Sequence, residues 1–234
     1  MNQNNKGFTL IELMLAMSFI AVLLLMIAMT VIQISNMYNR GLTLKEVNQA
    51  GRSLSSELTH SIAASAPFLV SGTETRYINP VNGPGGRLCL GQYSYIWNYG
   101  KSLAGGTPLS NKFSSGSTAN IRFVRVPDST GYYCTSVTPA PLPDVNPVGA
   151  VELLDVGDLD LAIHSFAITT AASASDARTH QSLYFVSFVI GTNEQVALNS
   201  NQSTCLPPSN LASDLNYCSV NQFDIVARAG NEVQ

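Results

Sequence analysis

The chain has few charged residues, and its N-terminal part has almost none. Lys, Arg, Asp and Glu make up 12% of the 234 residues, the net charge is −3, and like charges never occur five in a row. This composition argues against a partner bound mainly through electrostatics, such as nucleic acid. Between Lys6 and Arg40 the only charged residue is Glu12, which leaves a long apolar stretch intact.

The sequence also lacks the patterns that indicate an enzyme or a zinc centre. It contains no G-x-S-x-G, H-E-x-x-H or P-loop sequence and no C-x-x-C pair. The three histidines, His60, His164 and His180, are isolated from one another and from cysteine. We therefore expect neither catalysis nor a bound cofactor.

One segment is apolar enough to cross a membrane. Residues 13–32 are 20 residues whose only polar members are Ser18 and Thr30. A helix of that length rises about 30 Å, which is the thickness of a hydrocarbon core. The sequence therefore predicts one span, and the remaining part, about 190 residues, is long enough for one compact domain.

Four cysteines, Cys89, Cys134, Cys205 and Cys218, all follow the apolar segment. An even number of cysteines in a domain outside the cytosol suggests two disulfides, for which three pairings exist. Four reduced, buried thiols are the alternative.

The N-terminus reverses the order of an ordinary secretory signal, in which the cleavage site follows the apolar stretch. Here a short polar leader, residues 1–7 with Lys6, precedes that stretch. A cut after Gly7 would keep the apolar helix and create an amino group on Phe8, one helical turn from Glu12. A carboxylate buried in a membrane costs at least about 2 kcal/mol and is usually functional. The alternative is that Glu12 is solvated at the headgroup level.

Residues 7–13, Gly-Phe-Thr-Leu-Ile-Glu-Leu, resemble the prepilin cleavage and methylation motif of type IV pilins and type II secretion pseudopilins. The resemblance implies that Gly7 precedes the cut and that Phe8 becomes the N-methylated first residue. It also implies that Glu12 pairs with the amino group of an adjacent subunit during assembly. Residues 8–32 would then serve first as membrane anchor and later as part of the filament core.

The same resemblance implies partners and a location. The partners are other pilins or pseudopilins, the prepilin peptidase and methyltransferase, the inner-membrane assembly platform, and membrane lipid before assembly. The location is the bacterial cytoplasmic membrane, crossed once with the N-terminus in the cytoplasm, and then a cell-surface pilus or pseudopilus.

The absence of proline from the helix bears on the kind of subunit. Many major pilins carry a proline in the apolar helix, whereas residues 8–66 contain none. We therefore favour a minor pilin of a type IV pilus that contributes to assembly initiation, adhesion or motility. The alternatives are a minor pseudopilin of a type II secretion system and a single-span anchored binding protein that never polymerises.

The helix is expected to continue past the membrane over residues 33–66. Its apolar positions follow helical spacing at 47, 51, 54, 58 and 62. Pro67 ends the pattern, and a helix from residue 8 to residue 64 would be roughly 85 Å long. Gly41 and Gly51 are its weak points, each costing up to about 1 kcal/mol relative to alanine.

Residues 67–234 have the pattern of a β-rich head. The expected strands are 88–90, 93–99, 121–126, 132–137, 161–169, 183–190 and 223–229. Residues 100–120 are expected to form a loop, and residues 139–147, which include four prolines, a connector. The predicted fold is α+β, a long N-terminal helix packed on an antiparallel sheet, and the pilin resemblance implies the same fold.

Cys205 and Cys218 bracket a loop of 12 residues that is rich in Pro, Ser and Asn. A loop of this kind near the C-terminus resembles the variable disulfide loop of many pilins. A Cys205–Cys218 bond is therefore the first expectation, and a Cys89–Cys134 bond is the second.

An acidic cluster, Asp155, Asp158 and Asp160, surrounds Gly157. Carboxylate oxygens on a turn are the ligands that calcium requires, but the spacing is not that of an EF-hand loop. We favour a turn before the next strand over a calcium site.

Tyr93, Tyr95, Trp97 and Tyr99 occupy alternate positions and would share one face of a strand. We favour a place in the core. The alternative is an exposed aromatic strip for adhesion to a surface, a glycan or DNA.

Overall fold

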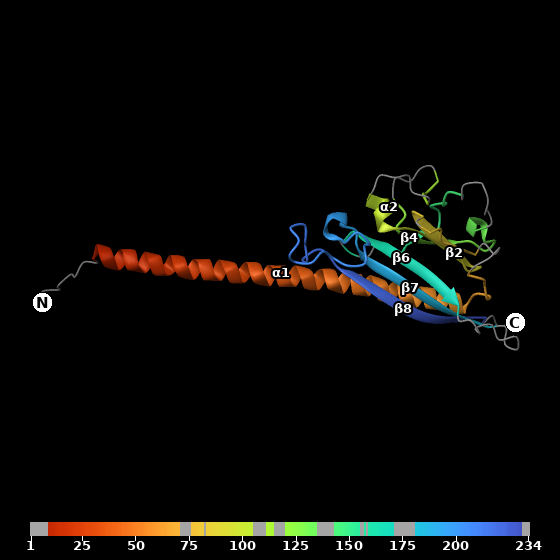
Figure 1. The fold of residues 1–234 in the computed structure, drawn as a ribbon, viewed down its shortest axis with the longest axis horizontal. Helices are drawn as coiled ribbons and strands as arrows, with labels where there is room; N and C mark the ends of the chain where they lie inside the picture. The colour runs from red at the N-terminus through yellow and green to blue at the C-terminus, as the bar shows by residue number, and fades with distance from the viewer. Residues whose placement is uncertain are drawn as a thin grey trace.

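One helix, α1 (Leu10–Ala63), runs from the N-terminal end of the computed structural model into the head (Figure 1). The structure describes residues 9–70, 76–81, 83–104, 111–114, 120–134, 143–154, 157, 159–170 and 181–230. Thr9 caps α1, because its hydroxyl accepts a hydrogen bond from the Glu12 amide and the Glu12 carboxylate accepts one from the Thr9 amide. The helix ends shortly before Pro67, and the prediction of one uninterrupted helix is confirmed.

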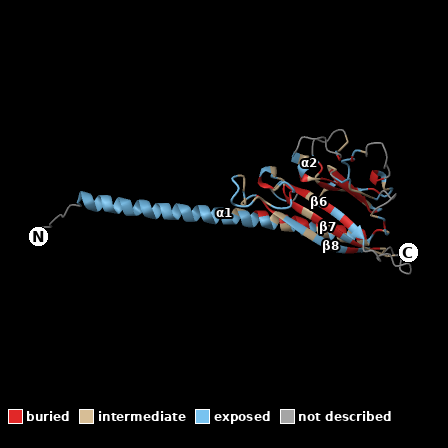
Figure 2. Ribbon diagram, in the orientation of Figure 1, coloured by how far each residue is buried: buried red, intermediate tan, exposed pale blue. Residues whose placement is uncertain are grey.

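Burial divides α1 into two halves (Figure 2). Every described residue up to position 38 is exposed, and this half of the helix is long and apolar enough to cross a membrane. The buried residues of the second half lie on one face: Thr43, Val47, Ala50, Gly51, Leu54, Leu58 and Ile62. The predicted apolar stripe is therefore confirmed.

The second half of α1 packs on a three-stranded antiparallel sheet. Its strands are β6 (Leu161–Thr170), β7 (Ser182–Thr192) and β8 (Val220–Ala229), with β7 in the middle. Phe188 of β7 stacks on Phe223 of β8 with 5.4 Å between the ring centroids. Phe223 in turn lies against Gly51, so the missing side chain at Gly51 lets the helix approach the sheet closely.

A second antiparallel sheet completes the described part of the head. Its strands, in their order across the sheet, are β1 (Tyr77–Ile78), β2 (Gly85–Cys89), β3 (Tyr93–Asn98), β4 (Phe123–Pro127) and β5 (Val151–Glu152). This sheet was not expected as a separate layer. The overall α+β prediction, a long helix with an antiparallel sheet head, is nevertheless confirmed.

The aromatic run of β3 joins the two sheets. Tyr95 and Trp97 are fully buried, and the Trp97 ring lies 5.6 Å from Phe123 and 4.4 Å from Phe166, measured between centroids. Tyr93 and Tyr99 are partly buried and pack against the same core cluster. The favoured interpretation as core is therefore confirmed, and the exposed adhesion strip is wrong.

Two local expectations are wrong. Residues 132–134 form a 3₁₀ turn, η1 (Tyr132–Cys134), and not the start of a strand, because the Asp128 carboxylate accepts hydrogen bonds from the Tyr132 and Tyr133 amides and closes the turn. Residues 135–137 lie outside the described part of the chain. A short helix, α2 (Gly100–Ala104), occupies the start of the predicted loop.

Candidate assembly and anchoring site

The N-terminal end of α1 carries the residues predicted to act in processing and assembly. Gly7 and Phe8 lie outside the described residues, which begin at Thr9. The Glu12 carboxylate accepts hydrogen bonds from the Thr9 amide at 3.0 Å and from the Thr9 hydroxyl at 2.9 Å. It therefore sits in the first turn of α1, where the helix dipole favours a negative charge.

The surface around Glu12 is apolar and uncovered in the single chain. Side chains along this half of α1 are largely exposed, for example 72% at Ile11 and 65% at Phe19. An apolar surface of this size requires lipid or other apolar helices around it. The apolar half of α1 is therefore suited to a bilayer or to the interior of a helical assembly.

Residues 2–32 match a known family described as the prokaryotic N-terminal methylation motif. This match supports a type IV pilin-like protein. No curated protein and no solved structure matches the chain. The motif implies processing by a prepilin peptidase and assembly with other pilins. Together with the apolar helix it supports anchoring in a membrane, and it indicates a structural role for the pilin-like chain.

The head of this pilin-like protein is closed by two disulfides, Cys89–Cys134 and Cys205–Cys218. These are the pairs expected from the sequence. The first bond ties β2 to η1, and the second closes a loop between η2 (Gln195–Ala197) and β8. We call residues 205–218 the C-terminal loop.

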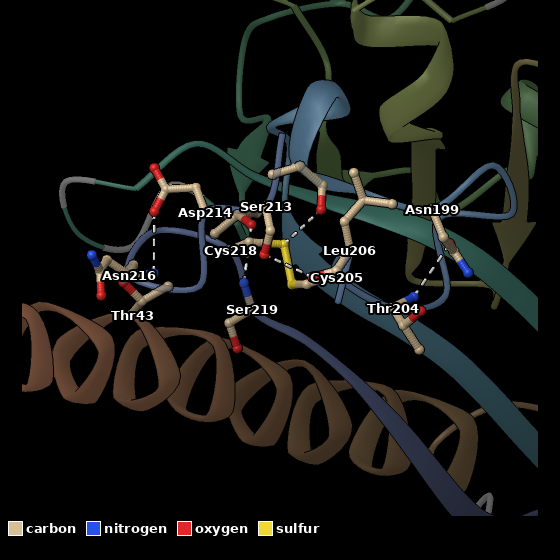
Figure 3. The surroundings of a disulfide bond; sticks show 12 residues. Thr43, Asn199, Thr204, Cys205, Leu206, Ser213, Asp214, Asn216, Cys218 and Ser219 are labelled. Atoms are coloured by element: carbon tan, nitrogen blue, oxygen red, sulfur yellow. Dashed lines mark hydrogen bonds between the residues drawn. A yellow bond between two sulfur atoms is a disulfide. The ribbon is translucent and has the colours of Figure 1, made fainter. Parts of the chain in front are cut away.

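The C-terminal loop is attached to α1 where the helix enters the head. The Thr43 hydroxyl donates to the Asn216 carbonyl at 2.9 Å (Figure 3), and the Asn39 side-chain amide donates to the Tyr217 hydroxyl at 3.2 Å. Sequence reasoning missed these contacts. A signal was present, because positions 39 and 43 extend the helical spacing of the buried stripe toward the N-terminus with polar residues.

A second polar attachment lies farther along α1. One oxygen of the Glu57 carboxylate accepts hydrogen bonds from Arg125 at 2.7 Å and from the Tyr95 hydroxyl at 2.8 Å. Burial alone would raise the pKa of Glu57, but the bonds from Arg125 and Tyr95 outweigh it and lower that pKa. The Arg125 guanidinium also lies over the Tyr93 ring, 4.8 Å from its centroid. Helix and second sheet are thus joined by a charged contact.

The acidic cluster is only partly described. Asp155 and Asp158 lie outside the described residues, while Asp160 forms an ion pair with Arg122 at 2.9 Å. Neighbouring Glu152 accepts hydrogen bonds from three backbone amides, of which the shortest is 2.7 Å long, and burial raises its pKa. Within the described part of the chain, no group of three metal-ligating side chains is placed to hold an ion.

The histidines do not form a site where they are described. His60 is exposed on α1, and His180 lies outside the described residues. His164 is half-buried between the Gln202 side chain at 3.3 Å and the Thr192 carbonyl at 3.1 Å, and burial lowers its pKa. Its contacts join the end of β7 to Gln202, which lies between η2 and the C-terminal loop, and are those of a structural residue.

Proposed function

We propose that this protein is a minor pilin of a type IV pilus, built into the filament through α1. The division of α1 carries the proposal. Its first half exposes apolar side chains in every direction, and its second half supplies the core of a disulfide-bonded head. The absence of proline from residues 8–66 favours a minor over a major subunit.

In this proposal each N-terminal residue has one role. A prepilin peptidase cuts between Gly7 and Phe8, and the new amino group of Phe8 is methylated. Glu12 then pairs with the amino group of an adjacent subunit in the low-dielectric interior of the assembly, where two uncompensated charges would be costly. The chain starts in the cytoplasmic membrane with its N-terminus in the cytoplasm and meets the assembly platform there.

Replacement of Glu12 tests this role. A Glu12→Ala chain should still insert into the membrane but should be lost from filaments sheared off the cell, as measured by immunoblotting both fractions. Ser18→Ala is the matched control, because the Ser18 hydroxyl bonds only to the Leu15 carbonyl of its own helix in the described structure. Equal amounts of both variants in the filament fraction would favour a single-span binding protein that never polymerises.

N-terminal mass spectrometry of the native chain tests the processing step. A chain that begins at methylated Phe8 is the expected result, whereas a chain that begins at Met1, or after residue 32, contradicts the proposal. A minor pseudopilin of a type II secretion system predicts the same N-terminus. Deleting the major subunit of each filament in turn separates the two, since the chain should leave the surface only with its own filament.

A further inference from the structure

The C-terminal loop lies at the end of the head that faces the apolar half of α1. In Figure 1 this loop, coloured blue, projects from the head toward the exposed part of the helix. The bonds from Asn39 to Tyr217 and from Thr43 to Asn216 fix it to the stalk at that level. The loop is thus the part of the head fastened nearest the predicted span.

Because α1 is continuous, the distance from the loop to a membrane follows from the residue numbers. The apolar run ends at Ile32, and Asn39 lies seven residues farther along, which is about 10 Å of helix. The headgroup layer on each side of a bilayer is about 5–8 Å thick. A common helix tilt of about 20° would lower a point 10 Å from the axis by about 3 Å. If α1 tilts toward the C-terminal loop, Tyr217, which is bonded to Asn39, therefore reaches the headgroup layer.

The exposed side chains at this level suit such a layer. Tyr38 and Tyr217 are 64% and 52% exposed, and Met37 is 77% exposed. Leu211, six residues before Tyr217 on the same C-terminal loop, is fully exposed. Tyrosine is enriched at membrane interfaces because its ring is apolar and its hydroxyl polar. Arg40 adds a cation that anionic headgroups attract.

The C-terminal loop is also ordered before any contact is made. The Cys205–Cys218 bond closes it, and the Ser213 hydroxyl donates to the Leu206 carbonyl at 3.0 Å (Figure 3). Directly after the loop, the Ser219 amide donates to the Thr192 hydroxyl at 3.2 Å. A surface held in this way loses little conformational entropy on binding.

We infer that, before assembly, the C-terminal loop and residues 37–38 rest on the lipid headgroups of the bilayer that holds α1. We call this surface the membrane collar. The membrane collar orients the head relative to the bilayer. Its contact with the lipid must break when the chain is drawn into a filament. The inference rests on the membrane anchoring of α1 and is independent of whether the filament is a pilus or a pseudopilus.

A fluorescent side chain on the collar tests the inference. The full chain with Leu211→Trp is reconstituted into vesicles of phosphatidylethanolamine and phosphatidylglycerol that contain a lipid spin-labelled on its headgroup. Leu69→Trp is the matched control, because Leu69 is also exposed but follows the end of α1, roughly 45 Å beyond Ile32. The wild-type signal of buried Trp97 is subtracted from both.

The headgroup label should quench the added fluorescence of Leu211→Trp roughly twice as much as that of Leu69→Trp. Equal quenching overturns the inference. The measurement is repeated in bilayer discs that hold one chain each. If Leu211→Trp is quenched in single-chain discs, lipid is the partner. If the Trp introduced by Leu211→Trp is protected from other quenchers only where several chains share a bilayer, and is not quenched by the headgroup label in single-chain discs, a second copy covers the collar and the inference is wrong.

The result is separable from the test of filament assembly. A chain that carries Glu12→Ala together with Leu211→Trp should show the same quenching although it fails to enter filaments. Quenching in that chain would support the membrane collar even if Glu12 proved unnecessary for assembly.

Discussion

Gly51→Ala should destabilise the head, although alanine is the better helix former. An alanine in the middle of α1 gains about 1 kcal/mol over glycine from helix propensity. A methyl group at Gly51, however, would overlap the Phe223 ring at Cζ, and overpacking of a core typically costs about 1–3 kcal/mol. The second effect is larger, so a net loss of up to about 2 kcal/mol is expected.

Thermal unfolding of the full chain in detergent micelles, followed by near-ultraviolet circular dichroism of the head, measures this loss. Each kcal/mol corresponds to about 2–4 °C in Tm for a domain of this size. Phe223→Leu removes the ring atoms that cause the overlap, and in that background Gly51→Ala should raise the Tm. If Gly51→Ala raised the Tm of the otherwise unchanged chain, the contact between α1 and β8 would be looser than described.

Three further predictions concern the head. Tyr184→Phe should cost about 1–3 kcal/mol in denaturant unfolding, because the Tyr184 hydroxyl bonds both the amide and the carbonyl of buried Phe68 at 2.6 and 2.5 Å; an unchanged midpoint would contradict this. Replacing Cys205 and Cys218 together by serine should lower stability by about 3 kcal/mol, the value expected for a disulfide that closes a loop of this length. Calorimetry of the oxidised wild type against the variant measures the difference. Because burial lowers the pKa of His164, its contribution to stability should be present above pH 6.5 and fall as the pH drops through the lowered value. Thermal melts between pH 7.5 and pH 5 should therefore show a Tm that depends less on pH in a His164→Gln chain than in the wild type.

The regular parts of the fold could be predicted from the sequence because their patterns are long. The stripe from Val47 to Ile62 repeats the helical period several times. Strand β6 was predicted to within one residue at its end, and β7 and β8 were predicted over most of their lengths, each three residues short. The apolar half of α1 is unambiguous for the same reason. Local patterns of this length outweigh single unfavourable residues such as Gly41.

The parts that could not be predicted depend on contacts distant in sequence. Strands β1 and β5 have two residues each, which is too short for alternation to be visible. The turn at Tyr132 depends on the Asp128 carboxylate, and the buried Arg87 donates hydrogen bonds to the Asn111 side chain and to the Tyr133 carbonyl. These hydrogen bonds form only once the folded chain has brought the partners together, so no local sequence pattern indicates them.

The candidate site divides in the same way. Glu12 could be identified from the motif, and the structure adds its bonds to Thr9. The attachment of the C-terminal loop to Asn39 and Thr43 could not be predicted from the sequence, because it joins residues more than 170 positions apart. Spacing along α1 indicates which residues face the head, but not which loop meets them.

The way α1 lies along the sheet has a mechanical consequence. The buried half of the helix runs beside β8 (Figure 1). A force along the axis of α1 therefore loads its buried side chains, including Val47, Leu54 and Leu58, in shear and all at the same time. A sideways pull would instead peel the helix away one contact at a time. It would begin at Thr43, which is held by the disulfide-closed loop. The weakest direction of loading is therefore the one that the loop reinforces.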